Sequence, residues 1–384
     1  MNKSVALVTY ARFPSEMAYG IHLIQIAKSF LENNLEVNVY YPKTYNLKTI
    51  NIQPNEYYNL NNEINFVEVN NIDITSYKFY QLLPKIFQKI LYTINTFLWT
   101  RSLMKVTKNE HFVWSTNPNL IWSLRNHFAI LLYEKHGQAK YIQKISISKL
   151  KKLKNAFLIS ITKKSQEDLA NSINKALYLP LGVDNKTFKP ISKTKNDQIK
   201  VGYVGFLETH GVDKGVSKAV KEILKLQKAM DFSTTIAGGP KYKIDEIRNL
   251  VSGNLNNNFE ILDFIPHKDV PNIISNFDIG IVPYPNNQHM NLYASPMKIF
   301  ELASCGVPIL ASNIEGHLNL NEFELGIFYY QHDDFNDFRE KLSILLKDES
   351  LRIDLKNKSL KNIKQLSFEN RTKIILSCVR SSIG

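Results

Sequence analysis

Short apolar runs alternate with segments of helical periodicity along almost the whole chain, and this alternation limits the fold more than any other feature. At the start, Val5–Tyr10 predicts a strand, Ile21–Leu31 a helix and Val37–Tyr41 a second strand. Further apolar runs, each too short for a helix, are His111–Trp114, Ile130–Tyr133 and Ala156–Ile161. A strand, a helix and another strand in succession are typical of parallel sheets, so we expect an α/β fold.

The chain turns polar between Ile191 and Gln198 and then starts a new buried strand at Ile199–Val204. After this candidate linker, the expected helices are Val216–Met230, Lys243–Ser252, Val270–Asn276 and Pro296–Ser304, and the expected strands are Ser233–Ile236, Phe259–Leu262, Ile279–Pro283 and Pro308–Ala311. A chain of 384 residues is longer than one core usually serves. We therefore predict two Rossmann-like, doubly wound domains, residues 1–190 and 191–366, facing each other across a ligand-binding cleft.

Positive charge is concentrated in the first half of the chain. The formal net charge is +13, and between Ile74 and Gln166 the only acidic residues are Glu110 and Glu134. The bases of this segment include Lys85, Lys89, Arg101, Lys105, Lys149, Lys151, Lys152 and Lys154. Such a field attracts nucleic acid, anionic lipid or phosphorylated substrates. A nucleic-acid-binding protein is an alternative on charge alone, but no recognisable reading element accompanies the charge, so we expect no nucleic-acid partner.

The same basic segment also contains apolar residues, among them Phe87, Leu91, Phe97, Leu98 and Trp99. This mixture suits a peripheral protein on an anionic cytoplasmic leaflet, where each base near the surface adds about 1 kcal/mol. The alternative is a charge that serves only solubility and substrate steering. The longest apolar stretch, around Ile90–Trp99, is about half of the roughly 20 residues that a spanning helix needs.

The start of the chain and its cysteines bear on the compartment. Val5–Val8 is a short apolar run followed by Arg12 and Pro14, which predicts a buried strand rather than a signal peptide. Cys305 and Cys378 fit no metal-binding spacing and no disulfide framework. We therefore expect a cytoplasmic protein in a reducing compartment, at most peripheral to the inner face of the plasma membrane.

The stretch Tyr293–Ser312 is the most informative part of the sequence. Ser295 suits the N-cap of a helix, Pro296 its first position and Gly306 the left-handed turn after its last residue. The N-terminus of such a helix offers free backbone N–H groups and the positive end of a dipole. A diphosphate needs both when no metal is available.

Glu301 lies about one and a half turns into this helix, close to the face shared by Met297 and Lys298. The run Ser295–Glu301, followed by Cys305–Ala311, resembles the donor-site signature of retaining GT-B glycosyltransferases, the large family four, or glycosyl transferases group 1. Further segments that resemble this family, in the right order, are Leu179–Asp184 with Phe188 and Pro190, Val204–Phe206 with Lys214–Gly215, Gly238–Pro240, Asp278–Tyr284 and Ser367–Arg371. The resemblance implies that residues 367–384 form a last helix that crosses back to the first domain.

The resemblance also implies roles for residues of the second domain. Glu301 would bind the nucleotide ribose, Lys214 the phosphates, and the amides of Ser295–Met297 the diphosphate or the sugar. Gly205 and Gly239 would lie in strand-end turns beside the donor. Lys214 would also be catalytic, because it stabilises charge on the departing phosphate.

Four further positions qualify this resemblance. Lys298 is either a donor contact or a structural lysine. Tyr293 stands where the family has the first glutamate of a spaced pair, Phe206 where it has an arginine, and Leu181 where it has an asparagine. These departures leave the donor sugar undetermined and reduce the cationic help available to the leaving phosphate.

The first domain supplies two candidates. Pro14–Gly20 connects the first strand to the first helix, where such enzymes bring a loop to the donor phosphates and acceptor, and Gly20 permits close backbone approach. Tyr133–Gly137 resembles the family's strand-end segment whose histidine faces the donor sugar. His136 is therefore expected on the catalytic face, where it acts by hydrogen bonding.

These residues predict a glycosyltransferase that moves a sugar from a UDP- or GDP-sugar to a glycan or lipid-linked acceptor, in lipopolysaccharide or capsule synthesis. The sequence has no convincing Asp-x-Asp element, so we expect no metal and no cofactor besides the donor. A retaining outcome is implied only by the resemblance. If it holds, front-side attack assisted by the leaving phosphate would make a side-chain nucleophile unnecessary.

Other interpretations stay open. Outside the motif, Glu301 would be a solvated helix glutamate, Lys214 an ordinary loop lysine and His136 a satisfied hydrogen-bonding histidine. A nucleotide-sugar epimerase of similar fold would process the donor without an acceptor. A non-catalytic nucleotide-binding relative is the other alternative, because of Tyr293 and Phe206.

Overall fold

The structure of the protein is a computed structural model that describes residues 3–45, 50–60, 63–107, 110–191, 198–209, 211–253 and 258–383. The chain divides into two compact units. Unit 1 comprises Met1–Leu179 and Arg371–Gly384, and unit 2 comprises Pro180–Asn370. Most of the polar linker expected at residues 191–198 lies outside the described residues.

Unit 1 is built on a seven-stranded sheet in the order β3-β2-β1-β4-β5-β6-β7, and every neighbouring pair is parallel. The strands are β1 (Ser4–Val8), β2 (Glu36–Pro42), β3 (Asn65–Val69), β4 (Phe112–Ser115), β5 (Ile130–Lys135), β6 (Ala156–Ser160) and β7 (Leu177–Tyr178). The order runs outward from β1 to β3 and then restarts on the other side of β1 with β4. The sheet therefore has a topological switch point between β1 and β4.

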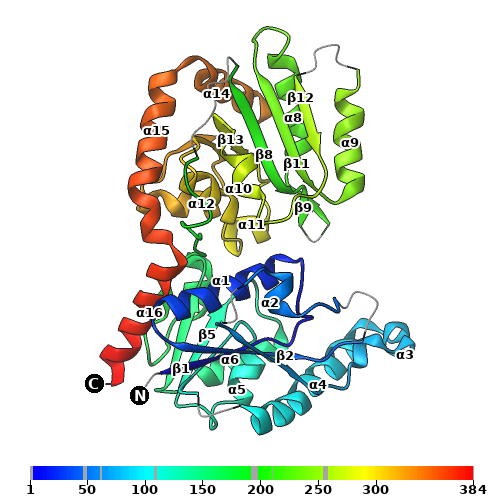
Figure 1. The fold of residues 1–384 in the computed structure, drawn as a ribbon, viewed down its shortest axis with the longest axis vertical. Coiled ribbons are helices and arrows are strands. Elements are labelled where there is room, and N and C mark those ends of the chain that lie inside the picture. The colour runs from blue at the N-terminus through cyan, green and yellow to red at the C-terminus, as the bar shows by residue number, and fades with distance from the viewer. Residues whose placement is uncertain are drawn as a thin grey trace. The chain divides into compact units, whose positions relative to one another are not determined.

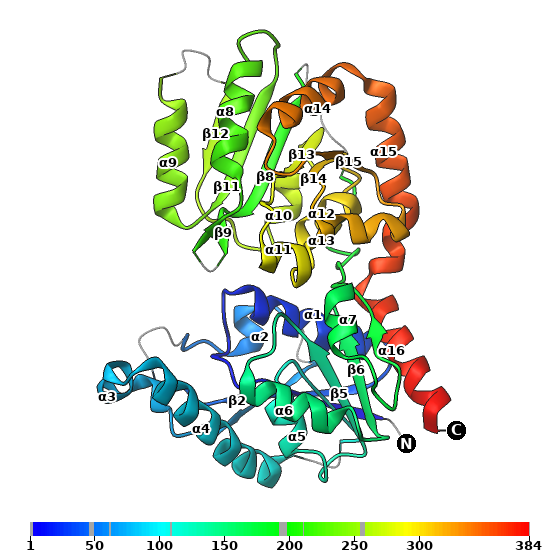
Figure 2. The same cartoon turned by 180° about the vertical axis from the view of Figure 1, so that it is seen from behind.

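Helices connect these strands (Figures 1 and 2). They are α1 (Ala18–Glu32), α2 (Pro54–Tyr57), η1 (Ile74–Ser76), α3 (Lys78–Leu82), α4 (Lys85–Val106), α5 (Pro118–Ser123), α6 (Tyr141–Leu150), α7 (Lys163–Asp168) and, from Arg371 on, α16 (Phe368–Ile383). Helices α4, α5 and α6 contribute Leu103, Leu120 and Leu150 to one core cluster with strand residues such as Val113 and Leu131. These three helices therefore cover one face of the sheet.

Trp99 belongs to this core. Its side chain is 2% exposed, and its indole Nε1 donates to the Val69 carbonyl at 3.4 Å. The expectation that Trp99 lies on an apolar, basic surface is therefore wrong. Phe87 and Leu98 are exposed, whereas Leu91 and Phe97 are half-buried.

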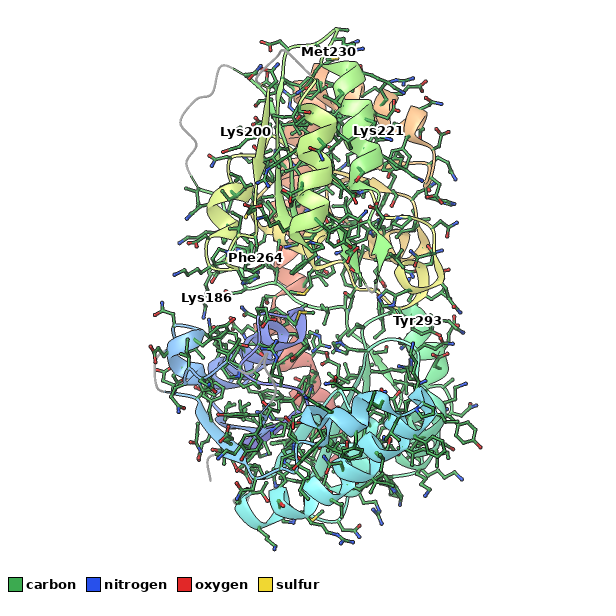
Figure 3. The ribbon with its side chains drawn as sticks, turned by 90° about the vertical axis from the view of Figure 1, so that its right-hand side faces the viewer. Lys186, Lys200, Lys221, Met230, Phe264 and Tyr293 are labelled. Atoms are coloured by element: carbon green, nitrogen blue, oxygen red, sulfur yellow. The ribbon has the colours of Figure 1, made fainter. Side chains whose placement is uncertain are left out.

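Unit 2 contains a six-stranded parallel sheet in the order β12-β11-β8-β13-β14-β15. The strands are β8 (Lys200–Phe206), β11 (Ser233–Gly239), β12 (Phe259–Leu262), β13 (Ile279–Val282), β14 (Ile309–Ser312) and β15 (Ile327–Tyr330), with a small antiparallel pair, β9 (Glu208–Thr209) and β10 (Val212–Asp213). In Figure 3, Lys200, at the start of β8, lies above Phe264, just after β12, so the two residues mark the amino and carboxyl ends of the strands.

The helices of unit 2 are α8 (Val216–Leu226), α9 (Lys241–Val251), α10 (Val270–Ile274), α11 (Gln288–Leu292), α12 (Met297–Ser304), α13 (Glu315–Leu318), η2 (Asn319–Phe323), α14 (Phe335–Lys347), α15 (Glu349–Asn362) and η3 (Ile363–Leu366). The strand order places the switch point between β8 and β13. The predicted α/β class with two doubly wound, parallel-sheet units is confirmed. No helix of the described residues is long and apolar enough to cross a membrane.

Candidate functional site

Three glycines shape the carboxyl edge of the unit 2 sheet. Gly205 and Gly238 are the penultimate residues of β8 and β11, with φ angles of +149° and +150°. A Cβ at Gly238 would lie 1.8 Å from the Gly205 carbonyl oxygen, and one at Gly215 (φ +81°) would lie 2.1 Å from that of Pro283. The strand ends and the turn into α8 therefore approach so closely that only glycine fits. Gly239 is paired with Phe206 at the same edge.

Lys214 lies in this turn, between β10 and α8. Its backbone N–H donates to the Leu207 carbonyl at 2.8 Å, and its Nζ is 5.3 Å from the centre of the Tyr284 ring. Burial, and then the charge of Lys298, lower the pKa of Lys214 to about 8, although the charge of Glu301 opposes this shift. The charges of Lys214, Lys298 and Glu301 thus act on one another, and two lysines near a single carboxylate leave an excess of positive charge that attracts an anion.

Glu301 is buried, with 3% of its surface exposed, so it is not a solvated helix glutamate. Lys298 Nζ lies 2.7 Å from its Oε2, and His267 Nε2 lies 3.5 Å from its Oε1, at the limit of a hydrogen bond. Burial opposes ionisation, but Lys298 and then His267 outweigh it and lower the pKa of Glu301 to about 2. The carboxylate is therefore charged at neutral pH, and Oε1 has only this distant partner among the described residues.

The helix that carries Glu301 begins one residue later than expected, at Met297, and no side chain caps it. Ser295 Oγ instead accepts a hydrogen bond from the backbone N–H of Leu181 at 3.0 Å. The prediction that Ser295 caps the helix is therefore wrong, because a residue distant in sequence uses its hydroxyl. The other end is as predicted: Gly306 has φ +71°, and the Val307 N–H donates to the Leu302 carbonyl.

Among the predicted residues of unit 2, Gly205, Lys214, Lys298 and Glu301 come together. A Cβ at Gly205 would lie 2.9 Å from Lys298 Cε. Tyr293 is buried and closes α11 through a hydrogen bond from its N–H to the His289 carbonyl, while Pro296 is buried and Met297 half-buried. Phe206 is 39% exposed, with its ring centre 5.9 Å from that of Phe264.

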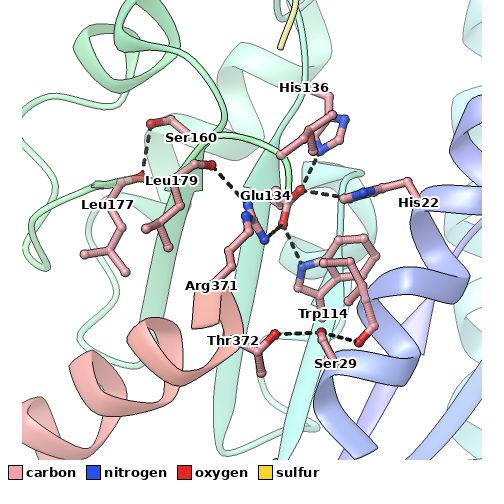
Figure 4. A network of polar contacts seen from close by, with 12 residues as sticks. His22, Ser29, Trp114, Glu134, His136, Ser160, Leu177, Leu179, Arg371 and Thr372 are labelled. Carbon is pink, nitrogen blue, oxygen red and sulfur yellow. Dashed lines mark hydrogen bonds and ion pairs between the residues drawn. The ribbon is translucent and has the colours of Figure 1, made fainter. Parts of the chain in front are cut away.

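In unit 1, His136 belongs to a polar network around Glu134 (Figure 4). Glu134 is fully buried at the end of β5. Its Oε1 lies 2.6 Å from His136 Nε2 and 3.0 Å from His22 Nε2. Its Oε2 accepts from Trp114 Nε1 at 3.2 Å and pairs with Arg371 Nη1 at 2.9 Å. His136 was predicted from the sequence, but its partners were not; the nearest signal was Glu134, two residues before it near the end of β5.

Electrostatics explain how this network holds a charge inside the unit. Burial opposes ionisation of Glu134, but Arg371, His22 and then His136 keep its pKa well below the usual value. Burial lowers the pKa of His22, which favours the neutral ring. Arg371 also donates from Nη2 to the Leu179 carbonyl at 3.3 Å. Glu134 therefore has partners on both oxygens.

The same residues form the one group in the described chain that could hold a metal, with ligand atoms of His22, Glu134 and His136 within 4.8 Å of one another. A tetrahedral zinc site with bonds of about 2.0–2.1 Å separates its ligand atoms by about 3.3 Å. The two N–O distances here, 2.6 and 3.0 Å, are those of hydrogen bonds. Arg371 also neutralises the carboxylate, so the residues fit a hydrogen-bonded network better than a metal site.

Gly20 has a local reason to be glycine. It lies in the first turn of α1, and a Cβ there would be 2.6 Å from Tyr58 Oη and 2.7 Å from the Ser15 carbonyl oxygen. The close approach at Gly20 thus involves Ser15 of its own loop and Tyr58, just after α2. A role of Gly20 in donor binding stays a prediction.

Comparisons with known proteins agree with this architecture. Residues 198–348 match the model of the family described as glycosyl transferases group 1. Sucrose-phosphate synthase from Thermosynechococcus elongatus is similar in structure, with a TM-score of 0.73, 15% identity and 99% of each chain covered. HepE from Anabaena, solved in complex with UDP and glucose, has a TM-score of 0.65 at 13% identity and covers 98% of this chain and 100% of its own.

A third similar structure is the lipopolysaccharide outer core galactosyltransferase WaaB, with a TM-score of 0.63 at 15% identity over 98% of this chain and 99% of that one. No curated protein matches the chain by sequence. The structural likenesses extend over both units, and the family match covers the Lys214–Lys298–Glu301 cluster. This chain therefore has the GT-B fold, and its residues 198–348 are similar to the glycosyl transferases group 1 family.

Proposed function

We propose that the protein transfers a sugar from a nucleoside-diphosphate sugar, a UDP- or GDP-sugar, bound at the carboxyl edge of the unit 2 sheet. The observation that carries this proposal is the cluster of Lys214, Lys298 and Glu301 beside the switch point between β8 and β13. Anionic ligands of doubly wound sheets bind at this place. The complex of HepE with UDP and glucose, on a similar fold, supports the same class of donor.

Each member of the cluster has a chemical task in this proposal. Lys214 and Lys298 bind the diphosphate and stabilise the negative charge that develops on it as the bond to the anomeric carbon breaks. Glu301 accepts hydrogen bonds from the ribose hydroxyls through Oε1, because Oε2 is held by Lys298. Two cations and glycine-lined strand ends suit a reaction without a metal, and we propose that none is needed.

For the second substrate we propose a glycan or a lipid-linked glycan of the cell envelope, as in lipopolysaccharide or capsule synthesis, and a site of action at the inner face of the cytoplasmic membrane. The fold similarity to WaaB supports this acceptor class. We further propose retention of configuration: the acceptor hydroxyl oxygen bonds to the anomeric carbon on the face that the diphosphate leaves, and its proton passes to the departing phosphate. His136, fixed through Nε2 by Glu134, would hydrogen-bond the donor sugar.

A ligand panel tests the donor assignment. UDP or GDP and their sugar derivatives should raise the melting temperature of the wild-type protein, because a ligand that binds only the folded state stabilises it. Glu301→Ala should lose most of this shift. Glu340→Ala, which removes an exposed glutamate from α14, should keep it. Absence of any shift with the whole panel would reject the donor site.

Turnover assays separate the transferase from the epimerase alternative. A transferase releases UDP or GDP only as fast as an acceptor, or slowly water, takes the sugar. An epimerase instead converts the donor sugar without releasing the nucleotide. Isomerised donor in the absence of acceptor would therefore contradict the proposal, and stoichiometric release of nucleotide with glycosylated acceptor would support it.

A further inference from the structure

Helix α4 has two different halves. Its buried residues, Asn95, Thr96, Trp99, Thr100 and Leu103, all lie from its midpoint onward. Asn95 Nδ2 donates to the Ile72 carbonyl at 2.6 Å and anchors the helix at its midpoint. No residue from Lys85 to Ile94 is fully buried. In Figures 1 and 2, this first half of α4 and the adjoining α3 lie at the margin of unit 1.

The outer face of α4 is apolar. It consists of Ile86, Phe87, Ile90, Ile94 and Leu98, whose side chains are 42% to 64% exposed. Four of these residues recur at every fourth position and therefore follow one another along the helix surface. Leu82, at the end of α3, continues the face and is 85% exposed. Contiguous exposed apolar surface of this kind marks an interaction site.

Charge shows which partner this face suits. The segment Ile74–Thr107 contains no aspartate or glutamate. Its five basic residues, Lys78, Lys85, Lys89, Arg101 and Lys105, are all exposed. No ion pair within the described part of the chain involves any of them. The partner must therefore offer apolar contact and negative charge together.

A second copy of this chain would meet the first requirement but not the second. A symmetric interface places the same patch on both subunits, so it would bring the five bases toward their own equivalents. An anionic lipid surface offers acyl chains for the isoleucines and phosphate groups for the lysines. The helix cannot cross the bilayer, since it is not apolar enough to do so. It can lie in the interface, with its apolar face roughly 5–10 Å below the headgroups.

We propose that α3 and the outer face of α4 dock unit 1 onto an anionic lipid surface, with Ile86, Ile90 and Ile94 in the interface and Lys85 and Lys89 on the lipid phosphates. This docking does not depend on the transferase proposal, because vesicle binding is measured without donor or acceptor. The proposal assigns the lipid contact to α3 and α4. The basic charge of the first half of the chain predicts only that anionic partners are attracted to it.

Co-sedimentation of the full chain tests the proposal, with phosphatidylcholine vesicles that contain or lack phosphatidylglycerol. The wild type should bind only the anionic vesicles, and high salt should weaken binding. Lys85→Glu with Lys89→Glu should reduce vesicle affinity on the order of tenfold or more. Ile86→Ser with Ile90→Ser should reduce it at low salt too, because the apolar contact is lost. All four residues are exposed, so thermal unfolding should be unchanged.

The matched control is Lys356→Glu with Lys361→Glu, which reverses two exposed lysines on α15 of unit 2. This variant should bind vesicles like the wild type. The proposal would be overturned if the wild type bound neither type of vesicle. It would also be overturned if the control variant lost as much vesicle affinity as Lys85→Glu with Lys89→Glu. A wild-type dimer that Ile86→Ser with Ile90→Ser converts to a monomer, without vesicle binding by either, would assign the face to a second copy. UDP or GDP stabilisation of the same samples reports separately on the donor site.

Discussion

Each unit of the protein buries one glutamate beside a histidine and a cation, but the two carboxylates are held differently. Glu134 of unit 1 has partners on both oxygens: two histidines on Oε1, and Trp114 and Arg371 on Oε2. Glu301 of unit 2 has Lys298 on Oε2 and only the distant His267 near Oε1.

The difference separates two uses of a buried charge. A saturated carboxylate such as Glu134 has little capacity left for a ligand, and it holds together elements that are far apart in sequence. Glu301 keeps an oxygen for a further donor at low cost, because Lys298 already lowers its pKa to about 2. Glu134 should therefore act mainly on stability and on the orientation of His136, whereas Glu301 should act mainly on ligand binding.

The largest expected effect is that of Arg371→Ala on folding. This change removes the guanidinium that pairs with Glu134 at 2.9 Å and leaves a fully buried carboxylate without its cation. Breaking a buried ion pair in this way costs about 3–5 kcal/mol. Urea unfolding of Arg371→Ala should show this loss, and Arg380→Ala, an exposed arginine on the same helix, should not. Similar small losses for both variants would contradict the structural role of the network.

The next largest effect is on donor affinity. Glu301→Ala should weaken binding of UDP or GDP by about tenfold to a hundredfold, since hydrogen bonds to a charged group contribute about 1.5–3 kcal/mol. The stability loss should be smaller than that of Arg371→Ala, because the unpaired Lys298 side chain is partly exposed and reaches solvent. Isothermal titration and urea unfolding measure the two quantities. A variant that unfolds easily but binds normally would reverse the roles assigned to the two glutamates.

A smaller effect concerns pH. The pKa of Lys214 is lowered to about 8, so the lysine is largely charged near pH 7 and largely neutral near pH 9. Nucleotide affinity should therefore fall several-fold as the pH rises through about 8, although the bound diphosphate moves this transition upward. Glu301 stays ionised throughout this range and cannot cause the change.

Two variants isolate this lysine. Lys214→Arg should remove the fall, because an arginine stays charged. Lys221→Arg, which changes an exposed lysine on α8, should keep it. Loss of the pH dependence in both variants would assign it to a group other than Lys214.

The sequence predicted some strands and missed others. The buried strands β1, β8, β13 and β14 are continuous apolar runs, so their pattern predicted them. The strands β3 and β15 went unpredicted; each lies at a sheet edge with one fully buried residue, although the edge strand β12, which has none, was predicted from its apolar residues. Ser295 fits the local pattern of a helix N-cap, but its hydroxyl oxygen instead accepts a hydrogen bond from the N–H of Leu181, which is 114 residues away.

Glu301 and Glu134 also differ in how far the sequence predicts their surroundings. Glu301 was found from the sequence because it lies in the motif Ser295–Glu301, and its lysine partner is three residues away on the same helix. Of the partners of Glu134, only His136 is near it in sequence. The others come from α1, β4 and α16, and His22 is 112 residues away, so no local pattern brings these together. Their assembly depends on the strand order of the sheet, which places β1 beside β4 and β4 beside β5.

The smallest expected effect is that of a metal chelator, and it tests whether the Glu134 network is hydrogen-bonded. If His22 and His136 are held by Glu134 at 3.0 and 2.6 Å, and the diphosphate is held by Lys214 and Lys298, then EDTA should leave both transferase activity and melting temperature unchanged. Added zinc should not stabilise the protein, because Arg371 already neutralises the carboxylate that would have to bind it. Loss of activity on chelation, restored by magnesium or manganese, would refute the metal-free account of the leaving group. Stabilisation by zinc that disappears in His22→Ala would instead make the network a metal site, and Glu134 rather than Glu301 would then be the carboxylate poised for a ligand.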